Sequence, residues 1–146
     1  MASIQKEFKL LLEKVGTQEG FQCKRFKSII RDTNNIVELS GHINCLLYFK
    51  IRSEAPYRWG VTHNRIEELK ASRKKWFVVL LYETPDNGYL LTPSDVRRYV
   101  KENLWPLGRG KNKNEYKIGP TKTLQYNEPF ETFRDFIKFL RVKLQQ

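Results

Sequence analysis

Residues 36–96 carry the strongest structural signal in this chain, and they read IVELSGHINCLLYFKIRSEAPYRWGVTHNRIEELKASRKKWFVVLLYETPDNGYLLTPSDV. Apolar segments at 36–39, 43–51 and 76–82 are separated by turn residues, a pattern that predicts β-strands. The segments 43–51 and 76–82 are apolar almost throughout, which is typical of strands buried on both faces. The stretch therefore predicts a sheet with two central strands.

Helices are expected before and after the strand at 76–82. Thr62 and Thr92 each stand where a side-chain oxygen can cap the first turn of a helix. Thr92 is followed by Pro93 and Asp95, which suit the first and third positions of a helix. The alternation of strand and helix predicts an α/β fold.

The outer segments extend this plan to one domain over residues 1–146. Its expected core covers about residues 4–96 and begins with a helix. Residues 105–129 are expected to be an irregular basic segment, and residues 130–144 a C-terminal helix. The fold class is therefore α/β, with a mixed central sheet flanked by helices.

The composition limits the possible kinds of protein. Apolar residues make up 40% of the chain, which argues against disorder. Cys23 and Cys45 are too few for a disulfide framework and have no zinc-ligand spacing, so two buried thiols are expected. No apolar run is long enough to cross a membrane and no secretory signal is evident, so a cytoplasmic location without membrane contact is expected.

The formal net charge is +11, from 27 Lys and Arg against 16 Asp and Glu. Such a surface attracts polyanions, and nucleic acid is the expected partner, with DNA favoured over RNA. The alternative is an ordinary solvated basic surface. The cations expected to contact phosphate away from the central strands are Lys74, Lys75, Arg109, Lys111 and Lys113.

Lys50 and Arg52 form the first candidate site, at the end of the strand 43–51. A buried lysine charge is costly without a partner, so the ammonium of Lys50 should reach a cleft or the sheet edge. Lys50 and Arg52 are two residues apart and should emerge on the same face. The alternative is that both side chains simply extend into water where the strand ends.

Tyr57, Arg58 and Trp59 form a second candidate site. A guanidinium group beside aromatic rings can hold a phosphate while a ring stacks on a base. We therefore expect Arg58 and Trp59 to contact nucleic acid. In the alternative interpretation, Trp59 covers the sheet and Arg58 is a surface charge.

The order of strands, the lysine that ends the third strand and the segments RWGVTHNRIEELK, WFVVLLYE and GYLLTPSDV resemble the restriction-endonuclease-like, or PD-(D/E)XK, nuclease superfamily. The resemblance covers roughly residues 4–96. It implies a restriction-endonuclease-like domain that cleaves phosphodiester bonds with Mg²⁺. The family's lysine, which orients the attacking water, would be Lys50.

The resemblance also implies carboxylate ligands for the metal. The acid on the second strand would be Glu38, with Asp32 as the alternative. The position two residues before the lysine is Tyr48, which departs from the family because a phenol cannot replace a carboxylate as a ligand for a hard cation. A displaced acid would then be needed, and Glu68 on the following helix is the chosen candidate, with the alternatives Glu54 and Glu67.

Three functions remain open from the sequence. The favoured one is a nucleic-acid-binding protein of nuclease ancestry whose catalytic site is degenerate and needs no cofactor. The second is an active Mg²⁺-dependent endonuclease that uses Lys50 and Glu38. The third is a protein-interaction module or accessory subunit, with a possible homodimer, indicated by an apolar outer position at Phe139 in the last helix.

Overall fold

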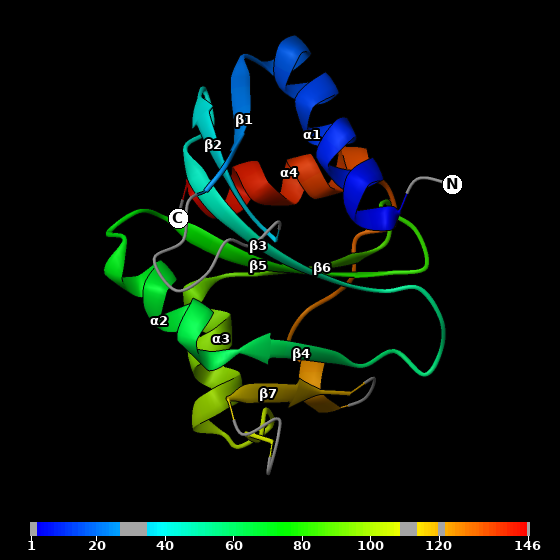
Figure 1. Ribbon diagram of the computed structural model, residues 1–146, viewed down its shortest axis with the longest axis vertical. Coiled ribbons are helices and arrows are strands. Elements are labelled where there is room, and N and C mark those ends of the chain that lie inside the picture. Colours follow the sequence, from blue (N-terminus) through cyan, green and yellow to red (C-terminus); the bar gives the residue numbers. More distant parts are fainter. Residues whose placement is uncertain (1–2, 27–34, 109–113, 120–121, 146) are drawn as a thin grey trace.

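The computed structural model describes residues 3–26, 35–108, 114–119 and 122–145. A twisted sheet runs through the middle of the molecule, and helices cover both of its faces (Figure 1). The elements are, in chain order, α1 (Ile4–Glu19), β1 (Phe21–Arg25), β2 (Ile36–Gly41), β3 (Cys45–Arg52), β4 (Trp59–Thr62), α2 (His63–Ala71), β5 (Trp76–Tyr82), β6 (Gly88–Leu91), α3 (Pro93–Lys101), β7 (Glu115–Ile118), the 3₁₀ turn η2 (Lys122–Leu124) and α4 (Phe133–Leu144).

The main sheet has five strands in the order β1-β2-β3-β5-β6. The central strands β3 and β5 are parallel, whereas the other neighbours are antiparallel. Parallel neighbours need a crossover connection, and here it contains β4 and α2. The predicted α/β class with a mixed sheet flanked by helices is confirmed.

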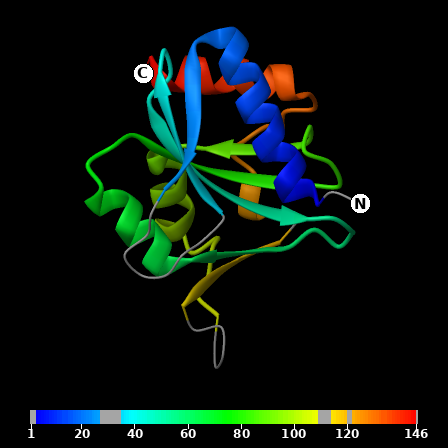
Figure 2. The same ribbon diagram turned by 45° about the horizontal axis from the view of Figure 1, so that its top comes forward.

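The apolar core lies in two layers, one on each face of the sheet. Helices α1 and α4 lie on one face, while α2, α3 and the small sheet lie on the other (Figures 1 and 2). Side chains alternate along β3, so Leu47 and Phe49 pack in the first layer and Leu46 and Tyr48 pack in the second. Both layers are fully apolar at these positions, which explains the unbroken apolar run in β3.

A second sheet of two strands was missed by the sequence analysis. β4 pairs antiparallel with β7, and Trp59 lies opposite Ile118. β7 falls inside the segment 105–129 that was expected to be irregular. Its signal is weak because only Tyr116 and Ile118 alternate as buried residues along four positions.

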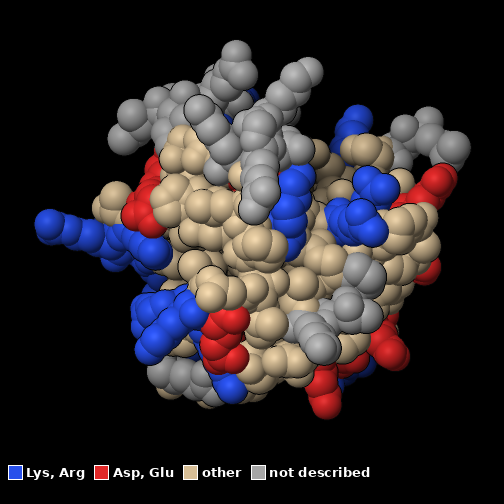
Figure 3. Space-filling view, turned by 90° about the horizontal axis from the view of Figure 1, so that it is seen from below, with Lys and Arg blue, Asp and Glu red and all other residues tan. Residues whose placement is uncertain are grey.

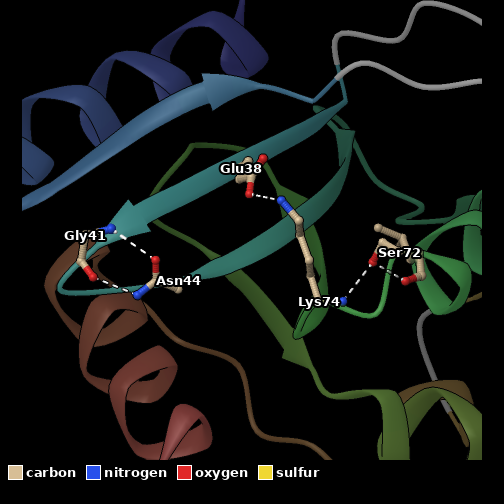
Figure 4. Close-up of polar contacts among 6 residues, drawn as sticks. Glu38, Gly41, Asn44, Ser72 and Lys74 are labelled. Atoms are coloured by element: carbon tan, nitrogen blue, oxygen red, sulfur yellow. Dashed lines mark hydrogen bonds and ion pairs between the residues drawn. The ribbon is translucent and has the colours of Figure 1, made fainter.

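The turn between β2 and β3 sets where both strands end. β2 continues to Gly41, beyond the expected end at residue 39, because Ser40 and Gly41 still pair with β1. The Asn44 side chain then holds the turn, since its Oδ1 accepts from the Gly41 N–H at 3.1 Å and its Nδ2 donates to the Gly41 carbonyl at 2.7 Å (Figure 4). β3 consequently begins at Cys45 and not at Ile43.

Helix starts follow the expected capping chemistry at most positions. Thr92 and Asp95 form a reciprocal capping box at α3, and Thr132 caps α4. Thr62 occupies the cap position of α2, but its side chain makes no capping hydrogen bond. Within the described ranges, no helix combines the length and the apolar character that crossing a membrane requires.

Candidate nucleic-acid interface

β3 delivers two cations to the face of the sheet that carries β4 and α2. Its first five residues are buried and its last three become progressively exposed. Lys50 and Arg52 continue the alternation of Leu46 and Tyr48, so they point to the same face as those residues. Lys50 is half-buried and Arg52 is exposed.

A cavity of about 580 Å³ opens beside this strand end, and we term it the strand-end cavity. The charged side chains that line it are Arg52, Arg58, Lys117 and Glu115. Three cations and one carboxylate make the cavity electropositive. An opening of this kind attracts phosphate groups.

The cations around the strand-end cavity are only weakly engaged within the chain. The Nε of Arg52 donates to the Glu54 carbonyl at 3.3 Å, and the Lys117 ammonium lies 4.0 Å from a Glu115 carboxylate oxygen. The side chains of Arg58 and of Lys50, which lies two residues before Arg52 and outside the cavity lining, make no hydrogen bond or ion pair with any residue that the structure describes. These groups therefore keep most of their capacity to bind an anion.

Trp59 does not have the open ring face that base stacking requires. Its side chain is only 4% exposed, and its Nε1 donates to the Leu81 carbonyl at 2.9 Å. The expected stacking role is therefore not supported, because the indole packs into the core layer between β4 and β5. The alternative interpretation of Trp59, a cover for the sheet, matches its position.

Half-buried tyrosines surround Trp59, and the sequence analysis missed two of them. The rings of Tyr57, Tyr82 and Tyr89 lie between 5.0 and 6.5 Å from each other or from Trp59. The predicted strands included Tyr82 and Tyr89. These two residues lie on one face of the sheet because of the register between β5 and β6, which the sequence does not give. The tyrosines pack against Trp59, which lines the strand-end cavity.

Tyr57 is fixed by a hydrogen bond that its hydroxyl donates to the Glu83 carboxylate. This hydrogen bond raises the pKa of Tyr57 to about 12, with a smaller contribution from burial. The phenol therefore stays neutral near pH 7. A neutral ring beside Arg58 does not repel a phosphate backbone.

Glu38, Lys74 and Lys75 lie together at the other end of the central strands. They line a second cavity of about 540 Å³ next to the β2–β3 turn. The Lys74 ammonium forms an ion pair with the Glu38 carboxylate (Figure 4), and the Lys75 Nζ donates to the Leu144 carbonyl at 2.8 Å. Both lysines thus already have partners within the chain.

The strand register separates Glu38 from Lys50. Glu38 lies opposite Leu46, which is four residues before Lys50 along β3. At about 3.3 Å per residue, this places the two backbone positions roughly 13 Å apart along the strand. The structure therefore does not bring the predicted catalytic pair together, and Glu38 serves Lys74.

Glu68 lies on α2 beside a cation of the same helix. Its side chain is 8% exposed, and one carboxylate oxygen is 3.8 Å from the Arg65 Nη1. The described residues contain no group of three or more His, Cys, Asp or Glu side chains placed to hold a metal ion. Glu38 on β2 and Glu68 on α2 lie on different elements and each is beside a cation, so they do not fit an Mg²⁺ site. Asp32 lies outside the described residues.

Tyr48 lies two residues before Lys50, where the resemblance described in the sequence analysis implied an acidic residue. Its side chain is 2% exposed, and its hydroxyl accepts a hydrogen bond from the Thr62 N–H at 3.2 Å. This hydroxyl serves the cap position of α2, where the Thr62 side chain makes no bond. Tyr48 thus joins β3 to the start of α2.

The face that carries β4 and β7 shows several separate groups of cations. Lys and Arg side chains gather in patches there, and acidic side chains lie next to some of them (Figure 3). Arg109, Lys111 and Lys113 lie outside the described residues, so their contact with nucleic acid stays a prediction. Lys117 was not among the predicted contacts, although its alternation with Tyr116 and Ile118 gave a signal for an exposed strand cation.

Comparisons with known proteins found similarity in structure and no match by sequence. No family model matches the sequence, and no curated protein matches it. Among solved structures, the chain is similar to Archaeoglobus fulgidus Hjc, a Holliday junction resolvase, with 13% sequence identity and a TM-score of 0.49 over 83% of this chain and 92% of that chain. Because both values are low, the function proposed below depends on this chain's own side chains.

Proposed function

We propose that this protein binds nucleic acid at the strand-end cavity, through phosphate contacts of Arg52, Arg58 and Lys117, and of Lys50, which lies beside the cavity on β3. The carrying observation is that Lys50 and Arg58 have no partner among the described residues while Arg52 and Arg58 line the same opening. Unpaired cations around an opening of this size contribute mainly sequence-independent affinity. Duplex DNA is the first ligand to test.

The second part of the proposal is that the domain has nuclease ancestry and a degenerate catalytic position. It is supported by a lysine near the end of β3, by the helical crossover to a parallel strand, and by Tyr48 two residues before that lysine. Replacing Tyr48 by an acid would bury a carboxylate and remove the hydroxyl that serves the Thr62 N–H. The contact between β3 and the start of α2 therefore depends on a phenol at position 48.

Binding assays with matched variants test the first part. Fluorescence anisotropy with a labelled duplex should show affinity about tenfold weaker for Lys50→Gln and for Arg58→Gln than for the native protein. The control is Lys101→Gln, which removes one exposed charge from α3 and does not alter the lining of the strand-end cavity. Equal weakening by all three variants would mean that only net charge matters and would contradict the proposed site.

A cleavage assay tests the second part. The native protein, incubated with plasmid or single-stranded DNA and Mg²⁺ or Mn²⁺, should leave the substrate intact. Cleavage that disappears in a Lys50→Ala variant would overturn the degenerate site and establish the endonuclease alternative. Cleavage that persists in Lys50→Ala would also overturn it, and would place the reacting groups elsewhere.

A further inference from the structure

Helices α1 and α4 leave a groove on the face of the sheet opposite the strand-end cavity. The two helices cover the same face without lying side by side along their lengths (Figures 1 and 2). A cavity of about 590 Å³ lies between them. Its apolar floor is formed by Leu11 and Val15 of α1 and by Phe133 and Ile137 of α4.

The walls of this α1–α4 groove are basic. Lys14 stands on the α1 side. Arg134, Lys138 and Arg141 stand on the α4 side at the spacing i, i+4 and i+7, which places them on one stripe of the helix. The acidic residue of the lining is Glu19, whose Oε2 lies 2.5 Å from Arg141 Nη2, so it offsets one of the four cations.

The remaining three wall cations are available to an outside partner. The side chains of Lys14, Arg134 and Lys138 make no hydrogen bond or ion pair with another residue in the described parts of the chain. They therefore leave about three positive charges along an apolar floor. These three cations have no acidic partner among the described residues, so a negatively charged ligand can pair with them.

Exposed aliphatic side chains lie outside each wall. Leu10 is 52% exposed and stands one helical turn before Lys14, and Val142 is 55% exposed and stands one turn after Lys138. They are two of the four large apolar residues that are exposed in the described structure. Apolar surface of this kind next to a groove is typical of a protein interface.

Phe139, which the sequence analysis expected at an apolar outer position of the last helix, is not part of this surface. It is half-buried against the core, and its ring centroid lies 6.4 Å from that of Phe130. The apolar surface of α4 that faces outward is instead supplied by Val142.

We propose that the α1–α4 groove binds an acidic amphipathic helix of a partner protein. The apolar face of such a helix would cover the floor, and its carboxylates would meet Lys14, Arg134 and Lys138. The lining of the groove on α1 runs over nine residues from Leu11 to Glu19, which is about 12 Å along the helix axis at 1.5 Å per residue. This length accommodates about two turns of a bound helix.

Two other occupants fit the groove less well. A nucleic-acid backbone offers phosphates to the walls, but it leaves the apolar floor in contact with charged groups. A second copy of this chain carries the same formal charge of +11 and brings the same basic walls. Charge complementarity therefore favours an acidic partner.

A synthetic probe tests the proposal with the full chain. The probe is an 18-residue peptide with leucines at helical spacing and glutamates elsewhere, and its control has the same composition in shuffled order. The ordered peptide should bind at least tenfold more tightly than the shuffled peptide. Isotope-edited NMR should place the shifted amide signals on α1 and α4.

Charge reversal separates the groove from the rest of the basic surface. The variant with Arg134→Glu and Lys138→Glu should lose at least tenfold in peptide affinity, and it should gain affinity for the same peptide with lysines in place of glutamates. The matched variant with Arg97→Glu and Lys101→Glu on α3 should bind both peptides as the native protein does. Circular dichroism checks that each variant is folded.

Each of the contrary results overturns the proposal. Equal binding of ordered and shuffled peptides would reduce the groove to a charged surface. Displacement of the peptide by duplex DNA, with loss of DNA affinity in the α4 variant, would assign the groove to nucleic acid. A dimer that dissociates on charge reversal of α4 would assign it to a second copy.

Discussion

Tyr48 connects the central sheet to the crossover helix through one hydroxyl group. The Thr62 N–H that it serves stands at the start of α2, where the threonine side chain makes no bond. Removing the hydroxyl leaves a part-buried donor without that partner, which costs free energy.

The variant Tyr48→Phe should lower the free energy of unfolding by about 1–2 kcal/mol. Urea denaturation measures this change. Tyr89→Phe is the matched control, because the Tyr89 hydroxyl makes no hydrogen bond with a described residue, and it should cost under about 0.5 kcal/mol. Equal effects of the two substitutions would contradict the role assigned to Tyr48.

The two thiols make stability depend on alkaline pH. Burial raises the pKa of Cys23 to about 11 and that of Cys45 to about 12. A raised pKa in the folded state stabilises the fold below the unfolded value, about pH 8.5, and the stabilisation is lost as the pH rises toward the folded value.

Between pH 8.5 and pH 10.5 each thiol should lower the free energy of unfolding by on the order of 2 kcal/mol. The double variant Cys23→Ala and Cys45→Ala should lose less stability over this range, since lysine and tyrosine titration is common to both proteins. Urea midpoints at several pH values give the two curves. Parallel curves would show that the thiols do not contribute.

At the scale of elements, helices α2, α3 and α4 differ in how they begin. α3 has a complete capping box, α4 has a single cap from Thr132, and α2 has a threonine that makes no cap bond. These differences predict different costs for the same substitution.

Thr92→Ala and Thr132→Ala should each lower the free energy of unfolding by about 1 kcal/mol, because each removes a hydrogen bond to a helix N–H. Thr62→Ala should cost less than about 0.5 kcal/mol. Chemical denaturation of the three variants checks this order. A loss at Thr62 as large as that at Thr92 would show that the threonine caps α2 after all.

The sequence predicted the long, strongly patterned elements and missed the short ones. β3 and β5 are recognisable because both of their faces are buried, so five successive residues in β3 and seven in β5 are apolar. β7 escaped because four residues with two buried positions do not rise above the surrounding polar segment. Short strands of this kind are stabilised by tertiary pairing and not by local pattern.

The candidate site was predictable only in part, for a related reason. Parity along one strand correctly placed Lys50 and Arg52 on one face, because it depends on local geometry alone. The distance from Glu38 to Lys50 depends on the register between β2 and β3, and the burial of Trp59 depends on the packing of β4. Neither the register nor the packing can be read from spacing in the chain.

At the scale of the whole molecule, the positive charge is divided among several places. The strand-end cavity and the α1–α4 groove lie on opposite faces of the sheet, and the cations at the β2–β3 turn are used within the chain. The two proposed surfaces can therefore be changed independently. A net charge of +11 alone would attract an anionic ligand equally to all basic parts of the surface, without favouring the strand-end cavity or the α1–α4 groove.

Counterion release distinguishes a local phosphate site from a diffuse basic surface. The logarithm of the binding constant falls linearly with the logarithm of the salt concentration, with a slope set by the number of phosphates contacted. Each lost contact makes the slope shallower by about one.

The most direct test is the salt dependence of duplex binding for three proteins: the native chain, Arg52→Gln with Arg58→Gln, and Arg97→Gln with Lys101→Gln. Both double variants lose two positive charges. The strand-end variant should show a slope shallower by about two, and the α3 variant should keep the native slope. Equal slopes for the two variants, or a shallower slope for the α3 variant alone, would contradict phosphate binding at the strand-end cavity.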